Sequence, residues 1–223
     1  MKVSEALASR RSVRGFLDKP VDAALLRRLI ELANRAPSGG NLQPWHVAVI
    51  AGDPLDGLKA AVADKIARGE IEPAEYAVYP PDLPEPYRTR RFAVGEEMYG
   101  HIGIPRTDKA GRLRWFAANY GFFGAPVGLF VHTPRFMGPP QWADMGIWLQ
   151  SLMLLLREEG LDSCPQEAWA MWPQTVRAFV PIPQDHILYT GMSIGWADAE
   201  APANRTRTVR APTEETTTFL GFS

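Results

Sequence analysis

A polar loop in the first quarter of the chain organises the rest, and it reads Ala36-Pro37-Ser38-Gly39-Gly40-Asn41-Leu42-Gln43-Pro44-Trp45-His46. Its prolines restrict the chain at both ends, and its two glycines permit backbone angles closed to other residues. A helical pattern precedes the loop, and the apolar run 47–51 that follows it predicts a buried strand. The loop offers uncharged hydrogen-bonding groups, which suit a planar ligand with polar edges better than a phosphate. The alternative is an ordinary helix-to-strand connection built from turn residues.

Composition narrows the class of protein before any motif is considered. A chain of 223 residues with 46% apolar residues fits one globular domain, residues 1–223. Its net charge of −1 favours neither nucleic acid nor an anionic membrane as a partner. The single cysteine, Cys164, excludes an internal disulfide and fits a reducing compartment. We find no apolar leader and no apolar run long enough to cross a bilayer, and therefore expect a cytoplasmic protein without a membrane partner.

Three arginines stand close together upstream of the loop, at Arg10, Arg11 and Arg14, with Ser12 between them. Most arginine runs are solvated basic edges. The functional alternative is a clamp for an anion, because a guanidinium offers several N–H donors in a rigid fork that matches phosphate oxygens. Arg10 and Arg14 are four residues apart and would share one face if this segment were helical.

The loop resembles the Pro-Ser-x-x-Asn-x-Gln-Pro-Trp signature of the flavin-dependent nitroreductase family. The arginine run of residues 10–14 stands upstream of it, as in that family, and a Gly-rich strand and an arginine-bearing tail close the chain. The resemblance extends from near residue 4 to the end and is weakest across residues 69–115. It implies an α+β fold, with a mixed, mainly antiparallel sheet flanked by helices, in a strand-exchanged homodimer.

The same resemblance implies that flavin mononucleotide (FMN) is held at each subunit interface. Residues 10–14 would approach it from one subunit and Pro37, Ser38 and Asn41 from the other. Arg14 would lie near N1 and O2 of the ring, and a backbone N–H of Glu167 or Ala168 would point at N5, so that no side chain performs the chemistry. The full set of expected cofactor-binding residues is Arg10, Arg11, Ser12, Arg14, Pro37, Ser38, Asn41, Gln43, Pro165, Gln166, Glu167, Ala168, Arg207 and Arg210. Arg210 matches the phosphate-binding arginine of the family best, Arg207 is the alternative, and Arg205 is expected to face solvent.

Several titratable residues have a second interpretation. His46 is either an acid or base near the flavin or a satisfied histidine at a strand start, and we favour the latter because hydride transfer by a flavin needs no histidine. Glu167 as a side-chain acid is the less favoured alternative to its backbone role. Cys164 is expected to be a small core residue, since nothing near it in sequence would lower its pKa. Asp144 is expected to begin and cap the most hydrophobic helix. No histidine has a partner at metal-ligand spacing, so we expect no metal site.

Hydrophobic periodicity supplies the remaining elements. Helices are predicted over residues 3–9, 21–35 and 53–68, the second with Asp22 as cap and Leu25, Leu29 and Leu32 on its apolar face, the third with Asp53 as cap. Strands are predicted over 126–131 and 187–195. Residues 91–123 are expected to be largely helical, with a break at 101–105.

Two segments are expected to lie outside the core. Residues 73–91 are too rich in proline for a regular helix or a central strand, and the extension 69–123 is either a lid on the substrate side or a passive surface wrap. Trp115, Tyr120, Phe122 and Phe123 are its candidates for an aromatic substrate wall. Residues 197–223 are expected to form an arm that reaches the partner subunit, because the apolar end would not suit a disordered tail.

The function implied by the resemblance is an FMN-dependent oxidoreductase that uses NAD(P)H to reduce nitroaromatics or quinones, small aromatic electron acceptors, by ping-pong hydride transfer. No Gly-x-Gly-x-x-Gly follows a strand, so the nicotinamide donor would bind only transiently, and NADH and NADPH are not distinguished. Two alternatives remain open. One is another reductive reaction on the same scaffold, such as dehalogenation, ene reduction or flavin reduction, and the other is a non-catalytic flavin-binding protein.

Overall fold

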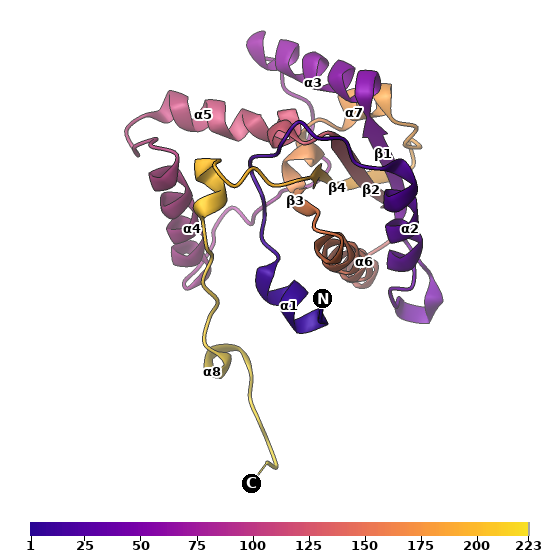
Figure 1. Cartoon of the computed structure of the whole chain (residues 1–223), viewed down its shortest axis with the longest axis vertical. Helices are drawn as coiled ribbons and strands as arrows, with labels where there is room; N and C mark the ends of the chain where they lie inside the picture. Colours follow the sequence, from indigo (N-terminus) through magenta and orange to yellow (C-terminus); the bar gives the residue numbers. More distant parts are fainter. Residues whose placement is uncertain (223) are drawn as a thin grey trace.

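The computed structural model describes residues 1–222, and Ser223 at the end of the predicted arm lies outside the described residues. A four-stranded sheet runs in the order β1-β2-β4-β3 (Figure 1). Its strands are β1 (His46–Ala51), β2 (Val127–Pro134), β3 (Asp162–Gln166) and β4 (His186–Gly195). All three strand pairings are antiparallel, with Val47 opposite Val131 and Leu129 opposite Met192. The predicted α+β architecture with a mainly antiparallel sheet is confirmed.

Helices cover both faces of this sheet (Figure 1). They are α1 (Val3–Ser9), α2 (Ala23–Ala33), α3 (Gly52–Ala67), α4 (Tyr87–His101), α5 (Lys109–Ala117), α6 (Pro139–Glu158), α7 (Pro173–Phe179) and the short α8 (Thr213–Thr216). Four 3₁₀ turns join them: η1 (Gly39–Asn41), η2 (Ala118–Gly124), η3 (Glu167–Met171) and η4 (Pro202–Arg205).

The core has two parts because successive strand residues point to opposite faces. On β2, Phe130 joins an apolar cluster with α3, α7, η2 and η3, whereas Leu129 and Val131 join a second cluster with α2 and α6. The side chains of Trp148 and Trp169 are fully buried, one in each cluster. The indole N–H of Trp148 donates to Asn34 Oδ1 at 2.9 Å, which fixes the end of α2 against α6.

Helix α6 packs Trp148, Leu152 and Leu156 into the core, but the predicted start of this helix is wrong. It begins at Pro139, where proline suits the first turn, and Asp144 lies inside it. The Asp144 carboxylate instead accepts the backbone N–H of Gly39, at 3.2 Å, so it caps the 3₁₀ turn of the polar loop. Ile147 is 42% exposed, which means that α6 is not buried on all sides of the single chain.

Three further element predictions need correction. On α2, Asp22 is the cap as predicted, but the buried face carries Leu26, Leu29 and Ala33, because α6 selects that stripe, and Leu32 is 47% exposed. Strand β1 lies at the edge of the sheet, so within it only Ile50 is buried. Helix α3 begins at Gly52 with Ala51 as its cap, which places Asp53 in the first turn.

The glycines of β4 mark close packing of protein side chains. A Cβ on Gly191 would collide with the indole of Trp169, and one on Gly195 would come 2.7 Å from Pro126. The close approach that these glycines permit is therefore made by core side chains. Trp169 belongs to η3, directly after β3, so Gly191 also determines how closely that turn packs against the sheet.

The segment after α3 is clamped to the body of the domain by buried glutamates. Glu75 has a side chain only 4% exposed, and it pairs with Arg177 at 2.7 Å and with Arg135 at 2.8 Å. The Glu72 carboxylate accepts the backbone N–H groups of Gln174 and Thr175 at the start of α7. Residues 72–75 are therefore anchored. The proline-rich run ends earlier than predicted, because α4 begins at residue 87, while the predicted helices and the break after residue 101 are confirmed.

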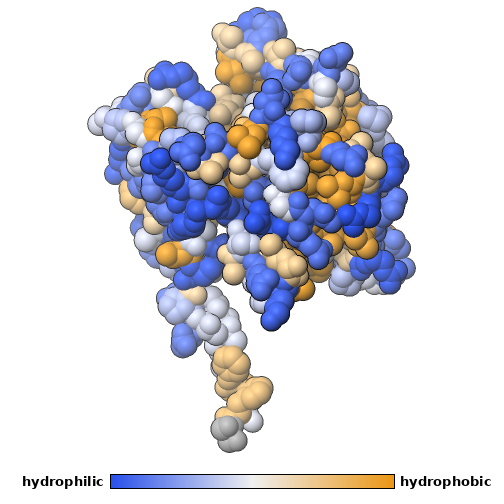
Figure 2. Space-filling model, viewed as in Figure 1, coloured by the Kyte–Doolittle hydropathy of each residue, from blue (hydrophilic) through white to orange (hydrophobic). Residues whose placement is uncertain are grey.

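The C-terminal arm leaves the body after η4. It first runs beside α4, where the Arg207 N–H donates to Glu97 at 2.8 Å and Glu215 pairs with Arg90 at 2.7 Å. Beyond α8 it extends away from the domain, as Figure 1 shows in yellow. Its apolar end projects into solvent in Figure 2, with Phe219 66% and Leu220 82% exposed. No helix in residues 1–222 is long and apolar enough to cross a membrane.

Candidate functional site

The arginine run of residues 10–14 is extended, and it lies beside β3. Helix α1 ends at Ser9, Ser12 forms a parallel bridge with Ser163, and the Val13 N–H donates to the Ser163 carbonyl at 3.1 Å. The segment is not helical, so Arg10 and Arg14 do not share a helical face. The two side chains still lie on the same side, because residues two and four apart share a face in an extended segment. Val13 is fully buried on the other side.

Near the start of this segment, arginines line a cavity of about 550 Å³, which we call the arginine cavity. The residues that line it include Ser9, Arg10, Arg11, Arg157, Asp162, Thr206, Arg207 and Arg210. Burial, followed by the charge of Arg210, lowers the pKa of the Arg10 guanidinium, and burial and Arg207 do the same at Arg11. The Nε of Arg11 is buried and has no hydrogen-bond partner among residues 1–222. This excess of donors and positive charge fits a bound phosphate group.

Arg157 was missed by sequence reasoning. It stands in the last turn of α6, and its Nη1 donates to Asp162 Oδ1 at 2.9 Å and to the Leu161 carbonyl at 3.4 Å. Burial raises the pKa of the Asp162 carboxyl, although Arg157 and Arg11 oppose that effect. Asp162 therefore holds one arginine of the cluster in position. No local pattern could have shown this, because the pairing depends on the turn between α6 and β3.

Asn204 is a second residue that sequence reasoning missed. It is 4% exposed, and its Oδ1 accepts the Arg14 N–H at 2.7 Å while its Nδ2 donates to the Gly15 carbonyl at 2.7 Å. The start of the arm thus holds the backbone around Arg14. Arg207 is also held, through bonds from its Nη1 to the Asn204 and Thr206 carbonyls, whereas Arg210 is exposed and bonds only within residues 208–209. Arg205 is exposed, as predicted.

A second cavity, of about 400 Å³, lies at the other end of the same two segments. We call it the acceptor cavity. Its lining includes Arg14 and residues 164–168, and the extension contributes Val78, Tyr79, Arg91, Met98, Tyr99, Trp115, Phe116, Asn119 and Phe123. Among the aromatic candidates Trp115 and Phe123 therefore reach the cavity. Tyr120 and Phe122 do not, because they pack on Trp169 in the core, with ring centroids 5.4 Å and 4.7 Å away.

The stretch 164–168 forms one wall of the acceptor cavity. Gln166 is 2% exposed, and its side chain is occupied by protein partners, donating to the Asn119 carbonyl and accepting from Ser193 Oγ, each at 2.7 Å. Burial raises the pKa of the Cys164 thiol, which agrees with a core role for it. Desolvation also raises the pKa of the Glu167 carboxyl, so this group holds its proton more readily than an exposed glutamate.

The polar loop has a defined structure, but it lies away from both cavities. Ser38 Oγ accepts the Gln43 N–H at 2.9 Å, and Asn41 and Gln43 adopt left-handed backbone angles, with φ of 57° and 49°. Non-glycine residues in this region carry strain that surrounding structure must hold. Residues 36–46 contribute nothing to the lining of the arginine cavity or the acceptor cavity within the described chain. One chain therefore brings together residues 10–14, 165–168 and 207–210, but not Pro37, Ser38, Asn41 and Gln43.

His46 belongs to a cluster of three histidines at the start of β1. Its ring centroid is 5.4 Å from that of His132 and 4.7 Å from that of His186, and the Nδ1 atoms of His132 and His186 are 2.8 Å apart. Burial, reinforced by His186 and His46, lowers the pKa of His132 to about 4. His132 and His186 share a hydrogen bond, His46 packs its ring against both, and none of the three lines the arginine cavity or the acceptor cavity of residues 1–222.

Comparison with known proteins identifies the family. The chain matches the Nitroreductase family over residues 7–196. It is 38% identical to the 4-nitrobenzoate reductase of Pseudomonas putida, over 97% of this chain and 94% of that protein. It is 36% identical to the nitrobenzene nitroreductase of Ectopseudomonas oleovorans, over 98% and 96%. The chain therefore belongs to the nitroreductase family, as the resemblance predicted.

Solved structures of the family superimpose closely on this one. The FMN and NADPH-dependent nitroreductase NfnB from sphigopyxis sp. strain HMH has a TM-score of 0.96 at 55% identity, covering 100% of both chains. The FMN-dependent nitroreductase NfnB from Mycobacterium smegmatis, solved in complex with NADPH, has a TM-score of 0.93 at 32% identity, covering 98% of each chain. The described fold is thus the nitroreductase fold over its whole length.

Proposed function

We propose that this chain is an FMN-dependent nitroreductase that takes hydride from NAD(P)H and passes it to a nitroaromatic acceptor. The observation that carries the proposal is the arrangement of the two cavities along one pair of segments. Arg10 lies at the first cavity and Arg14 at the second. Four residues of extended chain span about 13 Å, which is comparable to the ribityl phosphate arm of FMN. Two relatives of this chain are named as reductases of 4-nitrobenzoate and of nitrobenzene. These names and the arrangement of the cavities support the same activity.

In this proposal each group of residues has a separate task. The arginine cavity binds the phosphate, through Arg10, Arg11, Arg207 and Arg210, with Arg157 as an additional cation. Arg14 places a positive charge beside the ring, which stabilises the reduced, anionic form. The backbone of residues 167–168 supplies a donor at N5 that does not titrate. FMN, when bound, supplies an N5 atom that accepts a hydride and gives it up again.

The acceptor cavity holds the nicotinamide first and the acceptor afterwards. Its aromatic walls, which include Trp115 and Phe123, favour flat rings and exclude water from the site of hydride transfer. Because one cavity serves both substrates in turn, the kinetics are expected to be ping-pong. Quinones are flat, electron-poor acceptors of similar size and form the second class of expected substrate.

The working unit is a homodimer in this proposal. The polar loop is shaped and exposed, the end of the arm is apolar and exposed, and both would be covered by a second chain. A partner would then bring Pro37, Ser38, Asn41 and Gln43 to the flavin. The protein is proposed to act in the cytoplasm, on small aromatic acceptors and without nucleic acid or membrane as partner.

An anaerobic titration of the purified protein with NADPH and then NADH, followed at the flavin absorbance band, tests the proposal. The band is expected to bleach with the donor and to recover when a nitroaromatic or a quinone is added. A flavin-containing protein that neither donor bleaches would contradict an NAD(P)H-dependent enzyme and favour the non-catalytic alternative. Recovery with halogenated or ene acceptors alone would favour a different reaction on the same scaffold. Protein that takes up no FMN would contradict the proposal altogether.

The phosphate assignment has its own test. The double variant Arg10→Ala/Arg210→Ala removes two cations from the arginine cavity and is expected to lose most of its FMN. Arg205→Ala is the matched control, because it removes an exposed arginine of the same arm that does not line the cavity. Retention of FMN at wild-type occupancy in the double variant would overturn the assignment.

A further inference from the structure

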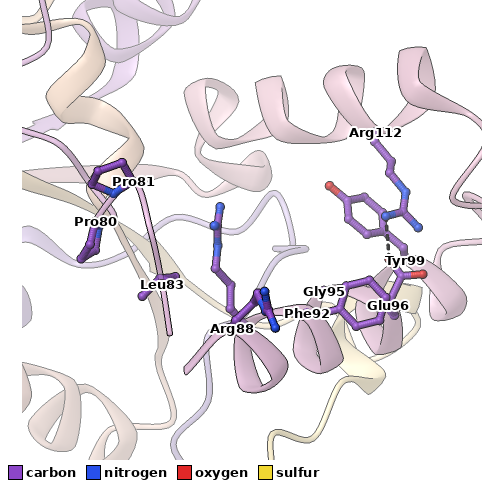
Figure 3. Close-up of a pocket in the computed structure, with 10 residues that line it drawn as sticks. Pro80, Pro81, Leu83, Arg88, Phe92, Gly95, Glu96, Tyr99 and Arg112 are labelled. Carbon is purple, nitrogen blue, oxygen red and sulfur yellow. Dashed lines mark hydrogen bonds and ion pairs between the residues drawn. The ribbon is translucent and has the colours of Figure 1, made fainter. Parts of the chain in front are cut away.

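A further arginine-bearing pocket lies beside the acceptor cavity, and we call it the side pocket (Figure 3). It has a volume of about 430 Å³ and opens between helix α4 and the proline-rich segment before it. Residues of α4 that recur every three or four positions form its floor: Arg88, Arg91, Phe92, Gly95, Glu96 and Tyr99. Pro80, Pro81 and Leu83 form the opposite wall, and Arg112 approaches from α5.

The three arginines of the side pocket differ in how firmly they are engaged. Arg112 pairs with Glu96 at 2.6 Å, the contact that is dashed in Figure 3. Arg88 pairs with Glu85, but both side chains are largely exposed, at 72% and 49%, and such pairs contribute little. Arg91 forms no ion pair within residues 1–222, and its guanidinium lies 4.0 Å from the ring centroid of Tyr79. Two cations are thus available to an incoming anion.

The side pocket adjoins the acceptor cavity, since Arg91 and Tyr99 line both. An extended ligand with two ring-bearing ends could place one end in each of the two neighbouring pockets. FMN has a single phosphate, and the arginine cavity beside Arg10 accounts for it. The simple nitroaromatic acceptors carry no phosphate. The remaining participant, a nicotinamide dinucleotide, has a flat adenine ring at the end opposite its reactive ring, and in NADPH this end also carries a 2′-phosphate.

We propose that the side pocket binds the adenosine 2′-phosphate end of NADPH. Arg88 and Arg91 contact the 2′-phosphate, because guanidinium forks match phosphate oxygens, and an arginine near the ribose is how proteins accommodate this group. Phe92 and the proline rings offer flat apolar faces to the adenine. The nicotinamide end then reaches the acceptor cavity. The proposal rests on the proposed function and deepens it, because it makes the enzyme selective for NADPH over NADH.

A substitution in the floor of the side pocket provides a second, independent test. A Cβ on Gly95 would meet nothing within 4 Å, so a larger side chain there enters the open volume without a clash. Gly95→Leu should also favour the helix, since glycine is a poor helix former. This variant fills the adenosine site while leaving every charge in place.

Binding of adenosine 2′,5′-bisphosphate and of adenosine 5′-monophosphate, measured by isothermal titration calorimetry on the FMN-containing protein, tests the proposal. Wild type should bind the bisphosphate about tenfold more tightly. Arg88→Ala should reduce that preference, since Arg91 alone then contacts the 2′-phosphate, and Gly95→Leu should weaken the binding of both ligands. Arg114→Ala is the matched control: it removes a 74% exposed arginine of α5 that does not line the side pocket, and it should behave as wild type. The ratio of kcat/KM for NADPH to that for NADH should fall with Arg88→Ala by the same factor.

Three results would overturn the proposal: equal affinity of wild type for the two nucleotides, an undiminished preference in Arg88→Ala, or an equal loss in Arg114→Ala. If NADPH still bleaches the flavin of wild type in any of these cases, the proposed function stands and only the assignment of the side pocket fails. If the protein takes up no FMN, the proposed function fails first, and the nucleotide titrations then show whether the pocket binds a 2′-phosphate on its own.

Discussion

The candidate flavin site has two halves, and within one chain they differ in how far their residues are buried and joined to the rest of the domain. The arginine half, residues 10–14 with 162–168 and the start of the arm, is joined by buried contacts such as those of Asn204 and Asp162. The loop half, residues 37–43, has its own internal hydrogen bonds and strained backbone angles, yet its side chains are largely exposed and line neither cavity. A loop that is shaped in advance but left uncovered is what a site completed by a second chain requires.

The most direct test of this difference alters the arginine half in one chain and the loop half in another, and then combines the two chains in one dimer. One chain carries Arg10→Ala and Arg14→Ala, and the other carries Asn41→Gly and Gln43→Gly, which remove amide side chains where glycine tolerates the left-handed backbone. Each parent should have almost no nitroreductase activity. A mixed dimer, purified through two different tags, should recover about half of wild-type activity, because one of its two sites is then intact. A mixed dimer no more active than its parents would show that the halves do not share a site.

The next largest effect is expected where the extension is anchored to the body of the domain through Glu75. Glu75→Gln leaves the 9% exposed side chain of Arg177 without its carboxylate partner. Breaking a buried pair from one side should lower the free energy of unfolding by about 3 kcal/mol. Urea denaturation measures this, with Asp56→Asn as the control, since the side chain of Asp56 is 73% exposed and the expected change is within about 0.5 kcal/mol. Equal effects of the two substitutions would refute the anchoring role.

Acid should lower the free energy of unfolding through the histidine cluster, which lies at the start of β1, directly after the loop half. The pKa of His132 is about 4 in the folded chain, and an unfolded histidine titrates near 6.5. Below about pH 6.5 the unfolded state therefore binds a proton at this histidine that the folded state does not bind. The free energy of unfolding should fall as the pH drops towards 4, by about 2–3 kcal/mol in total. Urea denaturation at a series of pH values measures the slope. His132→Gln should flatten it, and an unchanged slope would assign the acid sensitivity to other groups.

The smallest effect is expected at the contact that holds the loop half to its own chain. Asp144→Asn keeps an oxygen that can accept the Gly39 N–H but removes the negative charge. FMN affinity should weaken only roughly threefold, as expected for losing the charge of one hydrogen bond. Fluorescence titration with FMN measures it. A loss as large as that of the Arg10→Ala/Arg210→Ala variant would mean that the loop half contributes as much binding energy as the arginine half.

Prediction from sequence succeeded where local signals were strong. Strands β2 and β4 were found because they are apolar runs bounded by turn residues, and α2 was found with its Asp22 cap. Strand β3 was not expected, since Asp162-Ser163-Cys164-Pro165-Gln166 has no apolar run, and it is a strand because β4 pairs with it. Its position at the end of the sheet order also explains how Pro165 is tolerated.

The candidate site divides in the same way. Arg10, Arg14 and residues 165–168 were expected at a cofactor, and the chain gathers them around two neighbouring cavities, although their contacts with FMN stay a prediction. Arg157 and Asn204 were missed, because each acts through a partner distant in sequence or across a turn. Whether the extension is a lid or a passive wrap stays a prediction: the fold shows that it is anchored at Glu75 and that Trp115 and Phe123 line the acceptor cavity.

The sequence by itself determined the family, the polar loop with its prolines and glycines, and the clustering of arginines near the N-terminus, since these depend on residue type and short spacing. Only the tertiary structure decided that residues 10–14 are extended along β3, that Asp162 holds Arg157, and that a second set of arginines borders the acceptor cavity. The physical reason is range. Backbone preferences and hydrophobic periodicity act over a few residues, whereas the depth of a cavity and the partner of a buried charge depend on which distant segments the packed core brings into contact.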